Sequence, residues 1–317
     1  MKQVVPFDQV IARGCGLDVH KKEIVATISG TEIKTETRSF GSTTSSLTEL
    51  KDWLLENSIT HVAMESTGVY WKPVLNILEL GGFTILVVNA RHIKYVPGQK
   101  TDKKDSEWIC KLLLAGLLKG SFVPDVKQRE LRDLTRYRRK MVQQVSAEKN
   151  RMIRIFEDAN LKLSSVFSSV TGVTCTKIID AILSGQTNPD YLVSLCTHKK
   201  LKSSSDEIRD AVEGRFTPHH HRMLKMIRSN INHLEGTIAE IEADINIYMQ
   251  PYNDVIERLV EIPGVGESTA KDLLAEIGVD MSVFPTERHI ASWAGICPGN
   301  NESAGKKKVP APRTETK

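Results

Sequence analysis

Hydrophobic and polar residues follow two distinct periods over residues 12–118. Apolar runs at 15–19 and 24–28, followed by an alternating stretch at 33–40, predict three strands. The shorter runs 60–64 and 83–88 predict two more strands. Apolar residues at helical spacing predict helices over three further segments, which are 46–56, 72–80 and 101–118.

The predicted order is three strands, then helix, strand, helix, strand and helix. An opening strand meander followed by alternating helices and strands indicates a mixed α/β sheet with helices packed on it. The ribonuclease-H-like fold has this order, although the order alone leaves other mixed α/β folds open. In a ribonuclease-H-like sheet, the first strand would lie beside the strand that ends in Glu65. We expect this N-terminal domain to cover residues 1–122.

The pattern changes beyond that domain. Residues 125–160 have no strand signal and only sparse apolar positions, whereas about 223–249 carry apolar residues at 3–4 spacing. The two segments predict an antiparallel coiled-coil-like arm, with weaker helices inserted between them, over residues 123–250. The His219-His220-His221 run in that insertion is expected in a solvated loop. Residues 251–317 predict a compact, mostly helical domain with an unfolded tail.

Charge and composition narrow the function classes. The 317 residues carry a net charge of +4, which permits a nucleic-acid partner without requiring one. No apolar run reaches the roughly 18 residues that cross a bilayer, and no signal segment is visible, so we expect a cytoplasmic protein without a membrane partner. The five scattered cysteines form no CxxC pair, which argues against a disulfide framework and a structural zinc site.

Basic residues are concentrated in the first helix of the predicted arm. Such a run can be a solvated helix face, but here the excess of arginine over acidic residues favours contact with an RNA or DNA backbone. The predicted contact residues are Arg129, Arg132, Arg136, Arg138, Arg139 and Lys140.

Four acidic residues occupy positions that suit metal binding. Asp18 and Glu65 stand at the ends of predicted strands, where a buried carboxylate is costly unless it is paired or bound to metal. Asp102 and Asp105 are three apart at a helix start and therefore share a face. Together they predict a site for Mg²⁺, with Mn²⁺ as an alternative. Taken singly, Asp102 and Asp105 could be ordinary first-turn helix acids and Asp18 a loop residue.

A glycine-rich turn precedes a helix in the C-terminal segment. The sequence Ile262-Pro263-Gly264-Val265-Gly266 has the form of a helix-hairpin-helix turn, in which Gly264 and Gly266 let the backbone approach a phosphate. An ordinary Gly-Pro turn between helices is the alternative. Its place after a basic arm favours nucleic-acid binding.

Five segments of the chain resemble one family. GLDVHKKEIV (16–25), AMESTGVYW (63–71) and TDKKDSEWI (101–109) resemble the DEDD transposases of bacterial insertion sequences, group one hundred and ten. IPGVGESTAKDLLAEIG (262–278) and FPTERHIASWAGICPGNNESAGKK (284–307) resemble the second domain of the same family. The resemblance runs from about Arg13 to Lys308.

The resemblance implies a recombinase with a RuvC-like N-terminal domain, a coiled-coil arm and a C-terminal transposase domain. It implies that Asp18, Glu65, Asp102 and Asp105 bind Mg²⁺ and that Ser303, otherwise an ordinary loop serine, is the nucleophile. The implied partners are DNA (element ends and target), a structured noncoding guide RNA, and further copies of the chain in a dimer or a tetramer of two dimers. A nucleoid-associated location follows from the DNA partner.

The end of the chain departs from the family pattern. Lys306 and Lys307 could neutralise a phosphate near Ser303, but the basic continuation usual in the family is replaced by a short tail, as in a truncated or frameshifted copy. The leading hypothesis is therefore a transposase that cuts and rejoins DNA. The alternatives are a RuvC-like nuclease that uses water as the nucleophile, and a truncated copy that binds nucleic acid without catalysis.

Overall fold

The structure is a computed structural model that describes residues 10–66, 68–89, 105–196 and 203–296, with the backbone alone of 302–303 and 306–307. Contacts divide the chain into two compact units, Met1–Val123 and Pro124–Lys317. The first unit ends next to the predicted domain boundary at residue 122. The second unit contains both the predicted arm and the predicted C-terminal domain.

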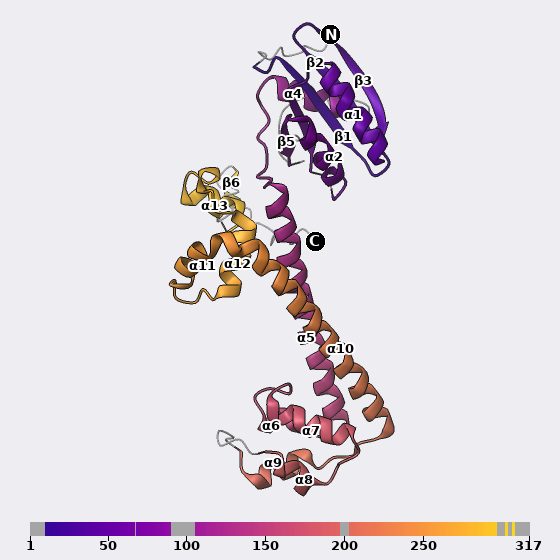
Figure 1. Ribbon diagram of the computed structural model, residues 1–317, viewed down its shortest axis with the longest axis vertical. Coiled ribbons are helices and arrows are strands. Elements are labelled where there is room, and N and C mark those ends of the chain that lie inside the picture. Colours follow the sequence, from indigo (N-terminus) through magenta and orange to yellow (C-terminus); the bar gives the residue numbers. More distant parts are fainter. Residues whose placement is uncertain are drawn as a thin grey trace. The chain divides into compact units, whose positions relative to one another are not determined.

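The first unit is built on a five-stranded mixed sheet in the order β3-β2-β1-β4-β5 (Figure 1). The first three strands form an antiparallel meander, and β4 and β5 continue it in parallel with β1. The prediction that the first strand lies beside the strand ending in Glu65 is confirmed. The strands are β1 (Arg13–Val19), β2 (Glu23–Gly30), β3 (Ile33–Gly41), β4 (His61–Glu65) and β5 (Thr84–Val88).

Helices cover both faces of this sheet. One face buries alternate apolar residues, such as Leu17 and Val62, against α1 (Thr44–Glu56) and α2 (Trp71–Leu78), which η1 (Glu79–Gly81) extends. The other face packs against α4 (Asp105–Leu114), with Ala63 of β4 buried between Ile109 and Leu113. Figure 1 shows these elements around the sheet.

Helix α4 is shorter than the predicted helix 101–118. It ends at Leu114, because Gly116 adopts a left-handed φ of 68° and its N–H turns back to Leu113 O (2.9 Å), which stops the helical ladder. Residues 101–104, where the predicted helix begins, lie outside the described residues.

The second unit contains the predicted arm. α5 (Val126–Asp158) and α10 (Pro218–Met249) pack side by side along their length (Figure 1). Side-chain hydrogen bonds connect the two helices, and residues near the start of one helix bond to residues near the end of the other. Tyr248 donates to Glu130, Arg138 to Glu242 and Asn230 to Glu148. The two helices therefore run antiparallel, as predicted.

The prediction of a solvated loop for the three histidines was wrong. Residues 219–221 form the first turn of α10, and His220 is 6% exposed. Thr217 and His220 form a reciprocal capping box, in which each side chain accepts from the backbone N–H of the other residue. The ring of His220 also contacts Asp158 at 2.7 Å and thereby ties the start of α10 to the end of α5.

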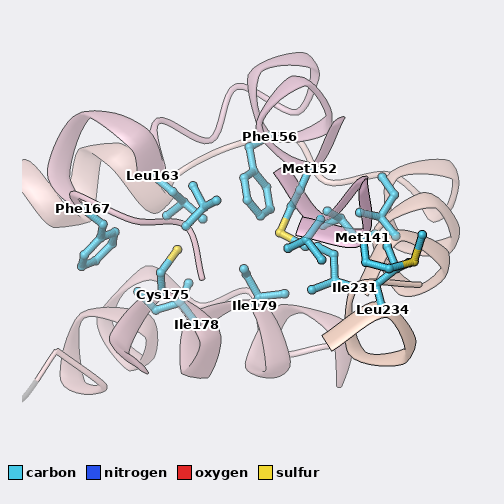
Figure 2. Close-up of a cluster of buried hydrophobic side chains, with 14 of the residues drawn as sticks. Met141, Met152, Phe156, Leu163, Phe167, Cys175, Ile178, Ile179, Ile231 and Leu234 are labelled. Atoms are coloured by element: carbon cyan, nitrogen blue, oxygen red, sulfur yellow. The ribbon is translucent and has the colours of Figure 1, made fainter. Parts of the chain in front are cut away.

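Short helices close the far end of the arm. Phe156 and Met152 of α5 meet Cys175, Ile178 and Ile179 in a buried cluster (Figure 2). The same cluster continues between α5 and α10, so the short helices and the arm share one core. The helices are α6 (Leu163–Val166), α7 (Val173–Leu183), α8 (Pro189–Ser194) and α9 (Ser205–Val212).

The C-terminal segment packs on α5 through α12. It is mostly helical, as predicted, and among the described residues it ends in a two-stranded antiparallel ribbon. Its elements are η2 (Gln250–Tyr252), α11 (Asn253–Val260), α12 (Glu267–Ile277), η3 (Met281–Val283), α13 (Glu287–Trp293), β6 (Glu302–Ser303) and β7 (Lys306–Lys307). Within the described ranges, no helix has the length and hydrophobicity that a membrane span requires.

Candidate active site

The face of β1 that carries Asp18 is identified by two glycines. A Cβ atom on Gly16 would lie 2.3 Å from both Ser106 O and Cys110 N of α4, so Gly16 faces that helix. A Cβ on Gly14 would likewise point at Leu113. Side chains alternate along a strand, and Asp18 therefore lies on the same face as these glycines, at the carboxyl end of β1.

Glu65 lies on that face as well. Ala63, two residues earlier on β4, packs against α4. The parallel register pairs Leu17 with Met64, so Asp18 and Glu65 follow at the same end of neighbouring strands. The carboxyl ends of parallel strands in an open α/β sheet are where ligands usually bind.

Asp105 is the first residue of α4, and its negative charge interacts with that of Asp18 at the end of β1. The pKa of Asp18 is raised above its usual value, chiefly by burial, and the negative charges of Asp105 and Glu65 raise it further. His20 opposes this rise. Three of the four predicted acids are therefore close enough for their charges to interact. Asp102 lies outside the described residues.

The carboxylates suit a hard divalent cation in kind but do not form a closed ligand set. Over the described ranges, no three His, Cys, Asp or Glu side chains are gathered tightly enough to hold a metal ion. Three oxygen donors at one sheet edge are nevertheless the donor type that Mg²⁺ and Mn²⁺ prefer. The raised pKa of Asp18 means that burial, together with the charges of Asp105 and Glu65, disfavours its ionised form, which a bound cation would favour.

Three residues near this edge were not predicted from the sequence. His20, two positions after Asp18, contacts Asp18 Oδ2 through its Nε2 at 3.0 Å. Ser106 and Thr27 form a buried hydrogen bond of 2.8 Å between α4 and β2. His20 could have been found from its two-residue spacing to Asp18. The Thr27–Ser106 pairing leaves no signal in the sequence because the two residues are distant along the chain.

The arginines of the predicted nucleic-acid interface are largely engaged within the chain. Arg132 donates to the backbone carbonyls of Ala275 and Glu276 at the end of α12, and Arg136 forms a two-pronged pair with the Glu276 carboxylate at 2.8 Å. The other predicted residues divide between internal contacts and solvent. Arg129 donates to Pro124 O, Arg138 contacts Glu242, Ser268 and Asp272, Arg139 contacts Asp272, and Lys140 is exposed.

These contacts form a single electrostatic cluster between α5 and α12. Burial lowers the pKa of Arg132, and Glu276 opposes that shift. Burial alone would raise the pKa of Glu276, but Arg136 and Arg132 hold it below its usual value. The favourable charge of Glu276 is therefore present above the pKa of an unfolded glutamate and is lost as the pH falls through the lower folded value. Acid should loosen the α5–α12 contact.

Arg132 is expected to be a stability residue. Replacing Arg132 by Met removes its hydrogen bond to Glu276 O, leaves Ala275 O with Gln128 as its donor, and removes the cation 5.9 Å from the Trp293 ring centre. We expect a loss of about 1–3 kcal/mol in the free energy of unfolding, measured by urea denaturation. The exposed Lys140→Gln variant is the matched control and should unfold as the wild type does. Equal stability of both variants would contradict the structural role.

The glycine turn and the C-terminal serine lie in the second unit. Gly264 has a φ of 88°, which favours glycine, and the exposed Gly266 caps α12 without a side-chain hydrogen bond. Ser303 lies in β6, opposite Lys306 of β7, and Lys307 follows in the same ribbon. Nucleic-acid binding by Gly264, Gly266, Lys306 and Lys307 and the nucleophilic role of Ser303 stay predictions.

Two family models match the chain. The DEDD transposase model of the IS110 type covers residues 15–160, and a model described as the transposase IS116/IS110/IS902 family covers 256–315. The two matches follow one another in the order that the sequence resemblance predicted. The chain belongs to the IS110 family of transposases. Asp18, Glu65, Asp102 and Asp105 fall within the first match and Ser303 within the second.

Two known proteins are similar to this IS110-family chain. A "Probable family 20 transposase" of Pseudomonas aeruginosa is 22% identical over 264 residues, which is 82% of this chain and 68% of the relative. A "Pilin gene-inverting protein" of Moraxella bovis is 34% identical over 77 residues, or 23% of this chain and 24% of that protein. Family and relatives together indicate a DNA-processing enzyme.

Proposed function

We propose that this chain is a recombinase that cuts and rejoins DNA at the ends of an insertion sequence, using a carboxylate site in the first unit and Ser303 in the second. The observation that carries the proposal is the gathering of Asp18, Glu65 and Asp105 at one sheet edge, inside the segment that the DEDD transposase model matches. The name of the Moraxella bovis relative, a gene-inverting protein, supports recombination as the reaction class.

In the proposed site, Asp18, Glu65 and Asp105 bind Mg²⁺ together with Asp102. When bound, the ion supplies Lewis-acid polarisation of a phosphate oxygen. Asp18 and Glu65, at the carboxyl ends of β1 and β4, would hold such an ion beside the scissile phosphodiester. The first unit has the strand order of a ribonuclease-H-like, or RuvC-like, domain, which supports assigning phosphodiester chemistry to this edge.

Ser303 is proposed as the nucleophile. Its Oγ attacks phosphorus and loses its proton, a phosphoserine ester forms, and the broken P–O bond leaves a strand with a free hydroxyl that takes up a proton. Rejoining reverses this step, because a hydroxyl of another strand attacks the phosphoserine and releases Ser303. The phosphodiester energy is conserved, so no nucleotide cofactor is consumed. Lys306 and Lys307 would neutralise phosphate charge beside the serine.

The proposed partners are element-end and target DNA and a structured noncoding RNA. Arg136, Arg139 and Lys140 are exposed members of the predicted contact set on α5, and the Gly264–Gly266 turn precedes α12 as a helix-hairpin-helix turn would. Membership of the IS110 family supports the RNA partner, a dimeric or tetrameric assembly and action at the nucleoid.

A covalent adduct tests the serine assignment. Full-length chain incubated with an element-end oligonucleotide, the RNA and Mg²⁺ should yield a DNA adduct that survives denaturing electrophoresis. The Ser303→Ala variant should form none, whereas Ser292→Ala, an exposed serine of α13, should behave as the wild type. Undiminished cleavage by Ser303→Ala would instead identify a hydrolytic nuclease. Binding without cleavage by the wild type would favour the binding-only alternative.

A further inference from the structure

The first residue of α4 is Asp105, and the hydrogen bonds within the helix do not by themselves fix its position. Asp105 is exposed at the first helical position, and the first N–H groups of a helix have no partners within it. Farther along, Ile109 and Leu113 are buried against the sheet. The body of α4 is therefore held by apolar packing, whereas its first turn needs a separate attachment if Asp105 is to stay beside Asp18.

Ser106 supplies that attachment. Its hydroxyl is hydrogen-bonded to the Thr27 hydroxyl at 2.8 Å, and the two residues are only 2% and 1% exposed. The Thr27 hydroxyl contacts Thr37 of β3 at 2.8 Å as well, so three hydroxyls form a chain from α4 into the sheet. A buried hydroxyl without a hydrogen-bond partner destabilises the fold. Any displacement of α4 that separates Ser106 from Thr27 is therefore unfavourable.

The attachment point lies close to both acids, one residue from Asp105 and two strand positions from Asp18. Ser106 directly follows Asp105, and Thr27 pairs across the β1–β2 ladder with Gly16. Gly16 in turn lies two residues before Asp18 on the same face. The hydrogen bond therefore joins the residue after Asp105 to a strand position that pairs two residues before Asp18.

We infer that Ser106 and Thr27 are positioning residues, whose buried hydrogen bond fixes Asp105 relative to Asp18 and so sets the divalent-metal affinity of the carboxylate site. This inference rests on the proposed function, since it supposes that the site binds a cation. Residues that orient metal ligands commonly change metal affinity by about 10–100-fold when they are removed.

Mn²⁺ binding to the full-length chain, followed by calorimetry and electron paramagnetic resonance, tests the inference. Ser106→Ala and Thr27→Val should each weaken Mn²⁺ binding about tenfold or more. Thr27→Ser, which keeps the hydroxyl, should restore most of the affinity. Thr35→Val, which breaks the separate exposed Ser29–Thr35 hydroxyl pair between the same two strands, is the matched control and should stay within about twofold of the wild type.

A coupling measurement separates positioning from general damage. If Ser106 acts through Asp105, then Asp105→Asn should cost much less affinity in the Ser106→Ala background than in the wild type. Thermal unfolding of each variant shows whether the fold is kept, and Thr27→Ser covers the case in which Thr27→Val does not fold. Unchanged Mn²⁺ affinity in a folded Ser106→Ala variant overturns the inference. Absence of Asp18-dependent Mn²⁺ binding in the wild type overturns the proposed metal site itself.

Discussion

Replacing Asp18 by Asn is expected to abolish strand cleavage while making the metal-free protein more stable at neutral pH. The variant removes a proposed metal ligand, so the cleavage rate should fall by about a thousandfold or more. It also removes a charge that burial and two neighbouring carboxylates disfavour. A gain in stability together with a loss of activity is the pattern that a functional site under electrostatic strain should show.

The stability effect should depend on pH in a defined direction. Because the pKa of Asp18 is raised in the folded chain, its contribution to stability is fully present below the unfolded pKa of about 3.9 and is lost as the pH rises through the folded value. The melting temperature of Asp18→Asn should therefore exceed that of the wild type most at neutral pH, and the difference should shrink in acid.

Divalent cations should reverse the order of stability. A cation at a hundred times its Kd stabilises a folded protein by about 2.7 kcal/mol, and Mg²⁺ should raise the melting temperature of the wild type but not that of Asp18→Asn. Glu49→Gln, an exposed acid on α1 at the other face of the sheet, is the control and should follow the wild type throughout. Cleavage by Asp18→Asn at the wild-type rate would rule out Asp18 as a ligand.

Adding one methyl group at Gly16 should have the second large effect. A Cβ there would stand 2.3 Å from two backbone atoms of α4, and backbone cannot rotate away as a side chain can. Gly16→Ala should push α4 off the sheet and cost about 1–3 kcal/mol of stability. Because Asp105 begins that helix, Mn²⁺ affinity and cleavage should fall with it.

Gly14→Ala provides the comparison for Gly16→Ala. A Cβ at Gly14 would meet the ends of the Leu113 and Leu114 side chains at 3.0 and 3.2 Å, which can adjust by small rotations. We expect Gly14→Ala to unfold within about 1 kcal/mol of the wild type and to keep its metal affinity. Urea unfolding and Mn²⁺ titration of both variants check this, and equal effects at the two glycines would refute a specific backbone contact at Gly16.

The sheet and its carboxylates could be predicted because their signals are local. Alternation in β3 and the short apolar runs of β1 and β4 identify strands, and an acid that closes such a run is conspicuous. The neighbourhood of β1 and β4 was predicted from the ribonuclease-H-like fold, one of the mixed α/β folds that the order of elements allowed. The pattern did not predict the contact between Gly16 and α4, because a glycine in a strand does not indicate which element packs against that face of the sheet.

The arm shows a different limit. Its helices were predictable from apolar spacing, but the partners of its arginines depend on which side of α5 meets α12. Arg138 turns toward Asp272 and Lys140 toward solvent, although both belong to the same basic run. The prediction of a solvated loop at the three histidines was wrong for a related reason. The capping role of His220 and its contact with Asp158 depend on the tertiary position of α10.

The side-chain hydrogen bonds between the antiparallel helices α5 and α10 also limit how the length of the arm can vary. α5 has 33 residues and rises by about 1.5 Å per residue, so it is about 50 Å long. Inserting one residue in its middle would rotate everything beyond by about 100°, separating Glu148 from Asn230 while leaving Glu130 beside Tyr248. Only insertions matched in both helices and close to whole turns would preserve the pairing. Related chains should therefore differ in arm length by paired steps of about seven residues, or two helical turns.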